Sequence, residues 1–298
     1  MATTTKSRAK KKTTKKTIRQ TQAKSAKATK KSVSTKVVKA TAAKKPVTKQ
    51  LLNRLNLASG VLALALAAAA GFLMNNTSYQ LFTGLLTKDE LASKAGTVFV
   101  PAVHAVYDLE LRWAVVVILA LSAVVPLLAA TRNRKQYETA LAKKVMLWRW
   151  IDMAVISALM VGVIALISGV QDVMTLKLIG AFMVITCALG WFSEKQNAHA
   201  SKPEWGNYVL SLVTGVLPWL LIAVYAVGTP LFGMVRSPWY VYALYATTLI
   251  AFLGYIGNQM RQLKGFQKYE VTERNYLQLG IFAKAAFAVI LIVGLYKS

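Results

Sequence analysis

Seven long apolar segments follow one another between residue 51 and the end of the chain. Each is long enough to cross the ~30 Å hydrocarbon core of a bilayer as an α-helix, which takes about 20 residues. No alternation of polar and apolar residues recurs, so a membrane β-barrel is not expected. The pattern therefore predicts seven transmembrane helices, at Leu55–Met74, Trp113–Ala130, Val145–Ser168, Val173–Phe192, Trp205–Val235, Ser237–Met260 and Asn275–Tyr296.

The connection between the first two apolar segments, Asn75–Arg112, is unusually long. It contains the stretch TVFVPAV at Thr97–Val103, which is rich in residues that favour strands. We expect a β-hairpin there that caps the helix bundle. The first apolar segment should be a retained helix, because both it and the basic region before it are too long for a cleaved signal peptide.

Charge and hydrophobicity occupy different parts of the chain. Hydrophobic residues make up 55% of the sequence, charged residues 16%, and the formal net charge is +26. Residues 1–50 hold 17 of the 37 Lys and Arg and none of the 11 Asp and Glu. They have too few large apolar side chains to offset the entropy lost on folding. Two domains are predicted: a disordered, Lys-rich tail at 1–50 and an all-α transmembrane domain at 51–298.

The distribution of Lys and Arg between the connections predicts the orientation in the membrane. With residues 1–50 set aside, the connections on the side of the N-terminus carry 12 Lys and Arg, against 6 on the other side. We expect a multi-pass protein of the plasma membrane with a cytoplasmic N-terminus and an extracellular C-terminus. The tail either fixes this topology as a solvated arm or also contacts anionic lipid or, weakly, nucleic acid.

Few residues are suited to disulfide or metal chemistry. The single cysteine, Cys187, precludes an intramolecular disulfide. Two histidines, His104 and His199, are too few for a His-rich metal site, and both fall in connections between the apolar segments. We expect no metal site and no enzymatic activity.

Two ionisable residues of opposite charge lie inside the apolar segments. Asp152 follows Lys144 by eight residues and Lys284 follows Arg274 by ten. At a rise of 1.5 Å per residue, both lie roughly 12–15 Å into the membrane. Buried charges are costly there and often mark function, whereas Lys177 is close enough to a membrane surface to reach water. Asp152 and Lys284 should form either an ion pair that holds the bundle together or a reactive site.

The chemistry of a buried lysine favours the reactive site. Desolvation disfavours the charged amine, and a neutral amine forms Schiff bases with aldehydes. Asp152 can supply the anion that a protonated Schiff base needs, and Arg149, one turn earlier, should help to keep Asp152 ionised. The segments also carry aromatic and small residues suited to an apolar, polyene-like ligand: Trp150, Trp191, Trp219, Tyr225, Tyr245, Phe252, Tyr255 and Phe287, with Ser122, Ser157, Gly162, Gly190, Gly254 and Gly280.

Seven helices, a lysine midway along the seventh and Arg-x-x-Asp on the third resemble a microbial rhodopsin. The cytoplasmic N-terminus inverts the usual orientation and is similar to heliorhodopsins. Four segments resemble heliorhodopsin sequences in the same order: RWID (Arg149–Asp152), GWFSEK (Gly190–Lys195), GVLPW (Gly215–Trp219) and ERNYLQLGIFAK (Glu273–Lys284). The resemblance covers about residues 51–298 and does not include the tail.

The resemblance implies a light sensor that binds all-trans retinal as a protonated Schiff base on Lys284, with Asp152 as counterion and Arg149 beside it. It implies a slow photocycle, a homodimer to which the first loop contributes, and a cytoplasmic signalling partner of unknown identity. Light would weaken the ion pair, and the connections at 131–144 and 259–274 would report the change. Further residues are expected at the retinal: Ser122, Ser157, Trp219, Trp191, Phe252, Tyr255 and Gly280.

Some positions depart from the heliorhodopsin pattern. The family usually has Glu where this chain has Asp152, His where it has Ala63 and Pro126, and Ser where it has Gly280. These changes affect the expected absorption maximum, the proton affinity of the linkage and the proton relay. They do not affect retinal attachment.

Proton pumping is not expected. Pumping rhodopsins carry a second carboxylate eleven residues after the first on the third helix, where this chain has Val163, and the segment Asn275–Tyr296 contains no carboxylate. One counterion without a second relay group favours sensing. Two alternatives remain: a retinal-free transporter or channel that uses Lys284 and Asp152, and a light-driven proton-translocating rhodopsin.

Overall fold

The computed structural model describes residues 48–88, 98–233 and 236–296, all within the unit Val47–Ser298. The expected disorder of the tail at 1–50 and its contacts with lipid or nucleic acid fall mostly on residues 1–47, which lie outside the described residues; Lys49 and Gln50 are helical. Thr97, the first residue of the β-prone stretch, also lies outside them.

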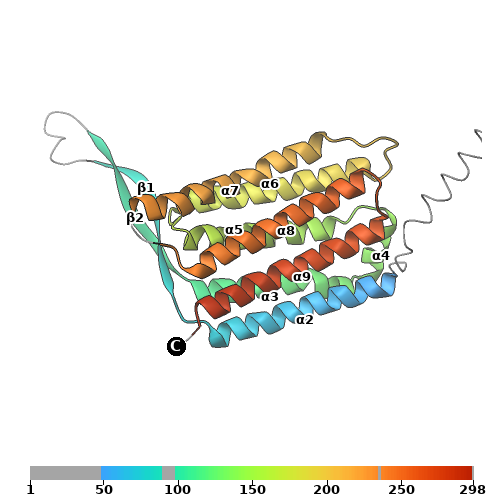
Figure 1. Cartoon of the computed structure of the whole chain (residues 1–298), viewed down its shortest axis with the longest axis horizontal. Helices are drawn as coiled ribbons and strands as arrows, with labels where there is room; N and C mark the ends of the chain where they lie inside the picture. Colours follow the sequence, from blue (N-terminus) through green and yellow to red (C-terminus); the bar gives the residue numbers. More distant parts are fainter. Residues whose placement is uncertain (1–47, 89–97, 234–235, 297–298) are drawn as a thin grey trace, which may run out of the picture. The chain divides into compact units, whose positions relative to one another are not determined.

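Seven of the described helices are long and apolar enough to cross a membrane, as predicted. They lie side by side in Figure 1, and each overlaps one predicted segment. Their bounds are α2 Lys49–Leu73, α3 Leu111–Ala130, α5 Leu147–Ile167, α6 Val173–Asn197, α7 Gly206–Phe232, α8 Trp239–Leu263 and α9 Tyr269–Gly294.

The helices form one bundle around a shared apolar core. Helix α2 packs between α3 and α9, α5 packs between α3 and α6, and α7 and α8 pack against α6 and α9 respectively. Side chains from all seven spanning helices meet in the core, among them Ile164, Phe287 and Leu291, which are fully buried. Many large apolar side chains, such as Leu220 and Ile250, are exposed on the outside of the bundle, which suits a lipid environment.

Two helices begin six residues before the predicted spans. Helix α2 begins at Lys49, where the Thr48 side chain accepts a hydrogen bond from the Leu51 amide at 3.2 Å and caps the helix. Helix α9 begins at Tyr269 instead of Asn275, and its first turns bury Thr272 and Glu273 inside the protein. Hydropathy could not identify the first turns of α9, because the polar side chain of Glu273 is paired inside the protein with Arg149 and Tyr137. In α2 the first turn lies outside the apolar segment, and its residues Lys49 and Gln50 are exposed.

A short helix that hydropathy did not predict, α4 (Arg134–Ala142), connects α3 and α5. Its buried residues Tyr137 and Leu141 pack with Leu52 and Met146 in a small second core. Burial raises the pKa of the Tyr137 hydroxyl, so it stays a neutral hydrogen-bond donor. In Figure 1, α4 lies at the opposite end of the bundle from the strands, and these ends are called the α4 end and the hairpin end.

The predicted hairpin is formed by β1 (Ser78–Lys88) and β2 (Phe99–Glu110). The strands are antiparallel, with Ser78 opposite Glu110, and a bulge follows Leu81. Leu81 is buried against Leu166 of α5 and Val173 of α6, and the Phe82 amide donates to the Gln171 carbonyl at 2.9 Å. Only this part of β1 is buried and no described residue of β2 is, so the hairpin covers the bundle at one edge and does not cap it fully.

Candidate functional site

A cavity of about 170 Å³ lies inside the bundle, and all seven spanning helices contribute to its lining. Its walls are mostly apolar, with Met160, Ile164 and Met183 among them. Its polar lining includes Asp152 of α5 and Lys284 of α9. An apolar chamber with a few fixed polar groups is typical of a ligand site between helices.

The structure brings Lys284 and Asp152 together within this cavity. The Lys284 Nζ lies 3.5 Å from the Asp152 Oδ2, and the Lys284 residue is only 7% exposed. The same ammonium group donates a hydrogen bond to the Ser122 carbonyl oxygen at 2.8 Å. The amine therefore has one anionic and one neutral acceptor.

The Ser122 carbonyl is free to accept this bond because of Pro126. In an α-helix the carbonyl of residue i accepts from the amide of residue i+4, and residue 126 in α3 is a proline without an amide hydrogen. The Ser122 hydroxyl is occupied elsewhere, since it donates to the Leu119 carbonyl at 2.8 Å. Ser122 therefore meets Lys284 through its backbone and not through the hydroxyl that the sequence suggested.

Most of the other expected pocket residues line the cavity. Ser157 does so with its hydroxyl 3.9 Å from the Cys187 thiol. The rings of Trp219 and Phe252 lie 6.1 Å apart, centroid to centroid. Beyond Gly280 there is open space, because a side-chain carbon built there would meet only the Tyr255 hydroxyl, at 3.5 Å. The remaining cavity-lining member of the predicted set is Tyr255 itself.

Trp191 does not line this cavity, contrary to expectation. It lies at a separate surface cleft near the α4 end, where the Lys195 Nζ sits 5.4 Å from its ring centroid. The reason is helical phase. Gly190 faces inward, since a side-chain carbon there would fall 2.5 Å from the Trp150 ring, and Trp191 is rotated by about 100° from it. Tyr225, Tyr245 and Phe287, also considered from sequence, are likewise absent from the cavity lining.

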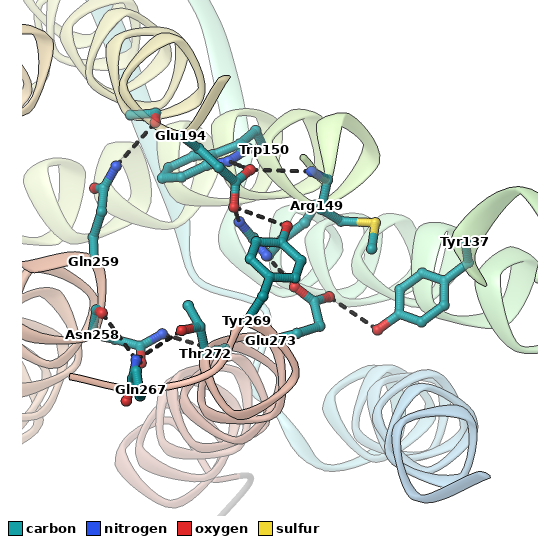
Figure 2. A network of polar contacts seen from close by, with 12 residues as sticks. Tyr137, Arg149, Trp150, Glu194, Asn258, Gln259, Gln267, Tyr269, Thr272 and Glu273 are labelled. Atoms are coloured by element: carbon teal, nitrogen blue, oxygen red, sulfur yellow. Dashed lines mark hydrogen bonds and ion pairs between the residues drawn. The ribbon is translucent and has the colours of Figure 1, made fainter. Parts of the chain in front are cut away.

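Arg149 forms its ion pairs with two glutamates and not with Asp152, so no ion pair supports the expectation that Arg149 helps to keep Asp152 ionised. Its Nη2 lies 2.5 Å from the Glu194 Oε1, and its Nη1 forms an ion pair with the Glu273 Oε2 (Figure 2). The guanidinium carbon also lies 4.1 Å from the centroid of the Tyr276 ring. Arg149 is therefore held by two buried carboxylates, and it is only 8% exposed.

Further donors complete this buried network, which Figure 2 draws. Glu194 accepts hydrogen bonds from the Trp150 indole at 2.7 Å and from the Tyr269 hydroxyl at 3.0 Å. Glu273 accepts one from the Tyr137 hydroxyl, also at 3.0 Å. One cation faces two carboxylates, so one negative charge is not balanced by Arg149. Neutral donors from α4, α5 and α9 stabilise this charge by hydrogen bonds. Because Arg149 and Trp150 also line the cavity, the network separates the cavity from the α4 end.

The two glutamates were missed as site residues because of where the predicted spans ended. The statement that the seventh span lacks a carboxylate is wrong for α9, which includes Glu270 and the buried Glu273. A signal was present: Glu273 precedes Lys284 by eleven residues, close to three helical turns, so both lie on one helix face. Glu194 was assigned to a connection but lies buried within α6.

Comparison with solved structures supports the same architecture. The transmembrane domain of the Salpingoeca rosetta rhodopsin phosphodiesterase is similar with a TM-score of 0.58 at 13% identity, over 83% of each chain. Halorhodopsin, a light-driven chloride pump, is similar with a TM-score of 0.55 at 15% identity, over 84% of this chain and 95% of that one. At these identities the likeness concerns the fold alone.

No curated protein matches the sequence. The heliorhodopsin family model, in contrast, matches residues 52–295, which includes all seven spanning helices except the first three residues of α2. The chain belongs to the heliorhodopsin family.

Proposed function

We propose that this protein senses light through all-trans retinal, bound as a Schiff base to Lys284 with Asp152 as its counterion. Family membership and the rhodopsin fold make it a membrane-embedded retinal protein of the photoreceptor type. The observation that carries the finer proposal is the buried amine of Lys284, 3.5 Å from a carboxylate inside an apolar cavity.

The residues present suit a polyene aldehyde. The cavity offers a primary amine at Lys284, aromatic walls at Trp219 and Phe252, and open space beside Gly280. The Trp219 indole nitrogen is buried and has no hydrogen-bond partner in the described part of the chain, and the face of its ring contributes apolar surface to the wall. Retinal supplies absorption of visible light and an isomerisation that moves the end attached to the amine.

The protein's own groups then hold the charge. Asp152 stabilises a cation on the Lys284 nitrogen. The Ser122 carbonyl offers a second acceptor, which does not titrate and so stays available at every pH. Movement of the nitrogen away from either acceptor weakens the charge pairing. The Arg149 network lies next to the cavity at the α4 end, and it is the candidate for the element that passes this change to the cytoplasmic connections.

The test is an absorption spectrum of the full chain expressed with retinal. We expect a visible band that hydroxylamine bleaches in light and that Lys284→Ala abolishes. The control Lys177→Ala, which removes a lysine from α6, should keep the band. Asp152→Asn should shift the band and lower the pH at which it fades by about 1–3 units, since an opposite charge at this distance has that effect. A colourless wild-type protein would favour a retinal-free transporter or channel.

Sensing without proton pumping is also part of the proposal. Apart from Asp152, no carboxylate is found among the residues that line the cavity, and Glu194 and Glu273 are held by Arg149. Illumination of cells in unbuffered medium should therefore produce no protonophore-sensitive pH change. Such a change in wild type that is lost in Glu273→Gln would instead make this network a proton relay.

Three further aspects belong to the proposal: a cytoplasmic N-terminus, a homodimer in the plasma membrane, and a signalling partner at the cytoplasmic side. A sensory role without catalysis accompanies them. The activity in the name of the rhodopsin phosphodiesterase belongs to that protein.

A further inference from the structure

We propose that a basic cleft at the α4 end binds the headgroup of an anionic phospholipid, whose acyl chain lies along the outer face of α5. The cleft has a volume of about 930 Å³ and is formed by α4, the start of α5 and the end of α6. It is separate from the Lys284 cavity, and the proposal does not depend on retinal binding.

The polar wall of the cleft is cationic. Lys135 and Lys143 approach from α4 and its C-terminal cap, and Lys195 from the last turn of α6. Gln136 and Thr139 add neutral donors. The lining contains no Asp or Glu, so three ammonium groups face the same space without an anion among them.

The nearby carboxylates are already engaged by other cations. Glu138 of α4 pairs with Arg134 at 3.1 Å and with Lys49 at 3.4 Å, and these hydrogen bonds lower its pKa. Glu194, next to Lys195 in sequence, points inward to Arg149. Within the described ranges, Lys135, Lys143 and Lys195 thus have no ion-pair partner at 4.0 Å or less.

The rest of the lining is apolar and continues down the outside of α5. Val145, Leu147 and Trp191 form the apolar wall. Leu147 is followed at four-residue intervals by Ile151, Val155 and Leu159, and all four are between 39% and 44% exposed. Residues spaced by four share one helix face, so an exposed apolar stripe runs from the cleft toward the middle of the spanning helix.

This combination favours a lipid over a free anion. The cleft lies at the ends of two spanning helices, at the level where headgroups occur if α5 and α6 cross the bilayer. A phosphate there meets the lysines, and an attached acyl chain can cover the α5 stripe. A soluble phosphate would use the lysines and leave the apolar wall and stripe without a role.

The experiment measures lipid retained by the full chain. Wild type is purified in detergent, supplied with equal amounts of phosphatidylglycerol and phosphatidylcholine, and examined by native mass spectrometry. We expect selective retention of phosphatidylglycerol, weakened by salt. Lys135→Gln/Lys143→Gln/Lys195→Gln should reduce its affinity by on the order of 100-fold, because a lysine near an anionic surface contributes about fivefold.

The matched control is Lys202→Gln/Lys264→Gln/Lys268→Gln, which removes the same charge from the other connections at the α4 end. It should retain phosphatidylglycerol as wild type does, and every variant keeps the basic tail. Equal losses in both triple variants, or no loss in the cleft variant, would overturn the proposal. Competition by inorganic phosphate as effective as by phosphatidylglycerol would also overturn it, in favour of a free-anion site.

Leu147→Asn/Ile151→Asn tests the stripe and should weaken retention without changing the preference for anionic lipid.

Discussion

At the scale of single residues, the site depends on three groups from different helices. Lys284 of α9 meets the Asp152 carboxylate of α5 and the Ser122 carbonyl of α3. The carbonyl is available because Pro126 cannot donate to it. A proline inside α3 thus leaves a backbone acceptor free for the buried amine.

Replacing this proline should reveal the role of the carbonyl. In Pro126→Ala the new amide can donate to the Ser122 carbonyl and compete with Lys284. A hydrogen bond to a charged group contributes about 1.5–3 kcal/mol, so the pH at which the visible band fades should fall by about 1–2 units. The measurement is a spectroscopic pH titration of the retinal-bound protein.

The control for that titration is Pro230→Ala, which also removes a helix-interior proline, but from α7 and outside the cavity lining. It should leave the titration unchanged. An unaltered titration in Pro126→Ala would show that the carbonyl does not contribute to holding the charge.

At the scale of elements, close helix contacts hold the polar network in place. Gly190 lets α6 approach α5 so that the Trp150 ring packs where a side-chain carbon would otherwise lie. The Trp150 indole in turn donates to Glu194, and Glu194 pairs with Arg149. Gly190 of α6 thereby helps to position the charged network that Glu194 forms with Arg149 of α5 and Glu273 of α9.

Enlarging this glycine should destabilise the protein. In Gly190→Ala the new carbon would lie 2.5 Å from the Trp150 ring, and the hydrogen bond to Glu194 restrains that ring. Overpacking of this kind costs about 1–3 kcal/mol, which a lower midpoint of thermal unfolding should report. Gly180→Ala in the same helix has its nearest contact at 3.9 Å and should be neutral or stabilising by up to about 1 kcal/mol. Equal effects of the two changes would contradict this account.

The N-terminus of α6 should make stability depend on pH. Asp172 caps it by accepting hydrogen bonds from the Thr175 side chain and amide, both at 2.7 Å, and these bonds lower its pKa. A lowered pKa stabilises the fold above about pH 3.9, the value for an unperturbed Asp, and this contribution is lost as the pH falls below that value.

Two substitutions at this cap separate its charge from its hydrogen bonds. Asp172→Ala should lose about 1 kcal/mol at pH 7, measured by denaturant or thermal unfolding. Asp172→Asn keeps an acceptor without the titration, so its difference from wild type should shrink between pH 7 and pH 3. A difference that is constant over this range would assign the stabilisation to the hydrogen bonds alone.

At the scale of the whole molecule, orientation decides which end meets the cytoplasm. The seven spans place α4 and the connections at 198–205 and 264–268 at one end, and the hairpin at the other. If the excess of Lys and Arg determines orientation, the α4 end is cytoplasmic. The Arg149 network and the basic cleft would then both lie on the cytoplasmic side.

Cysteine labelling can measure this orientation. The only native cysteine, Cys187, is 4% exposed and should react slowly. We expect Lys88→Cys in the hairpin to react with a membrane-impermeant maleimide in intact cells. Lys264→Cys in the opposite connection should react only after permeabilisation. The reverse pattern would place the N-terminus outside the cell.

The sequence alone predicted the seven helices, the hairpin, the family and the position of Lys284 inside the bundle. The helices, the hairpin and the position of Lys284 follow from local composition and periodicity, since a span of about 20 apolar residues has few alternatives in a bilayer. The family followed from the resemblance of four short segments to heliorhodopsin sequences. The tertiary structure decided the partners of Arg149, the outward position of Trp191 and the role of the Ser122 carbonyl. These depend on which helix faces meet. Hydropathy shows where polar residues occur, but it does not show which of them pair with one another inside a bundle.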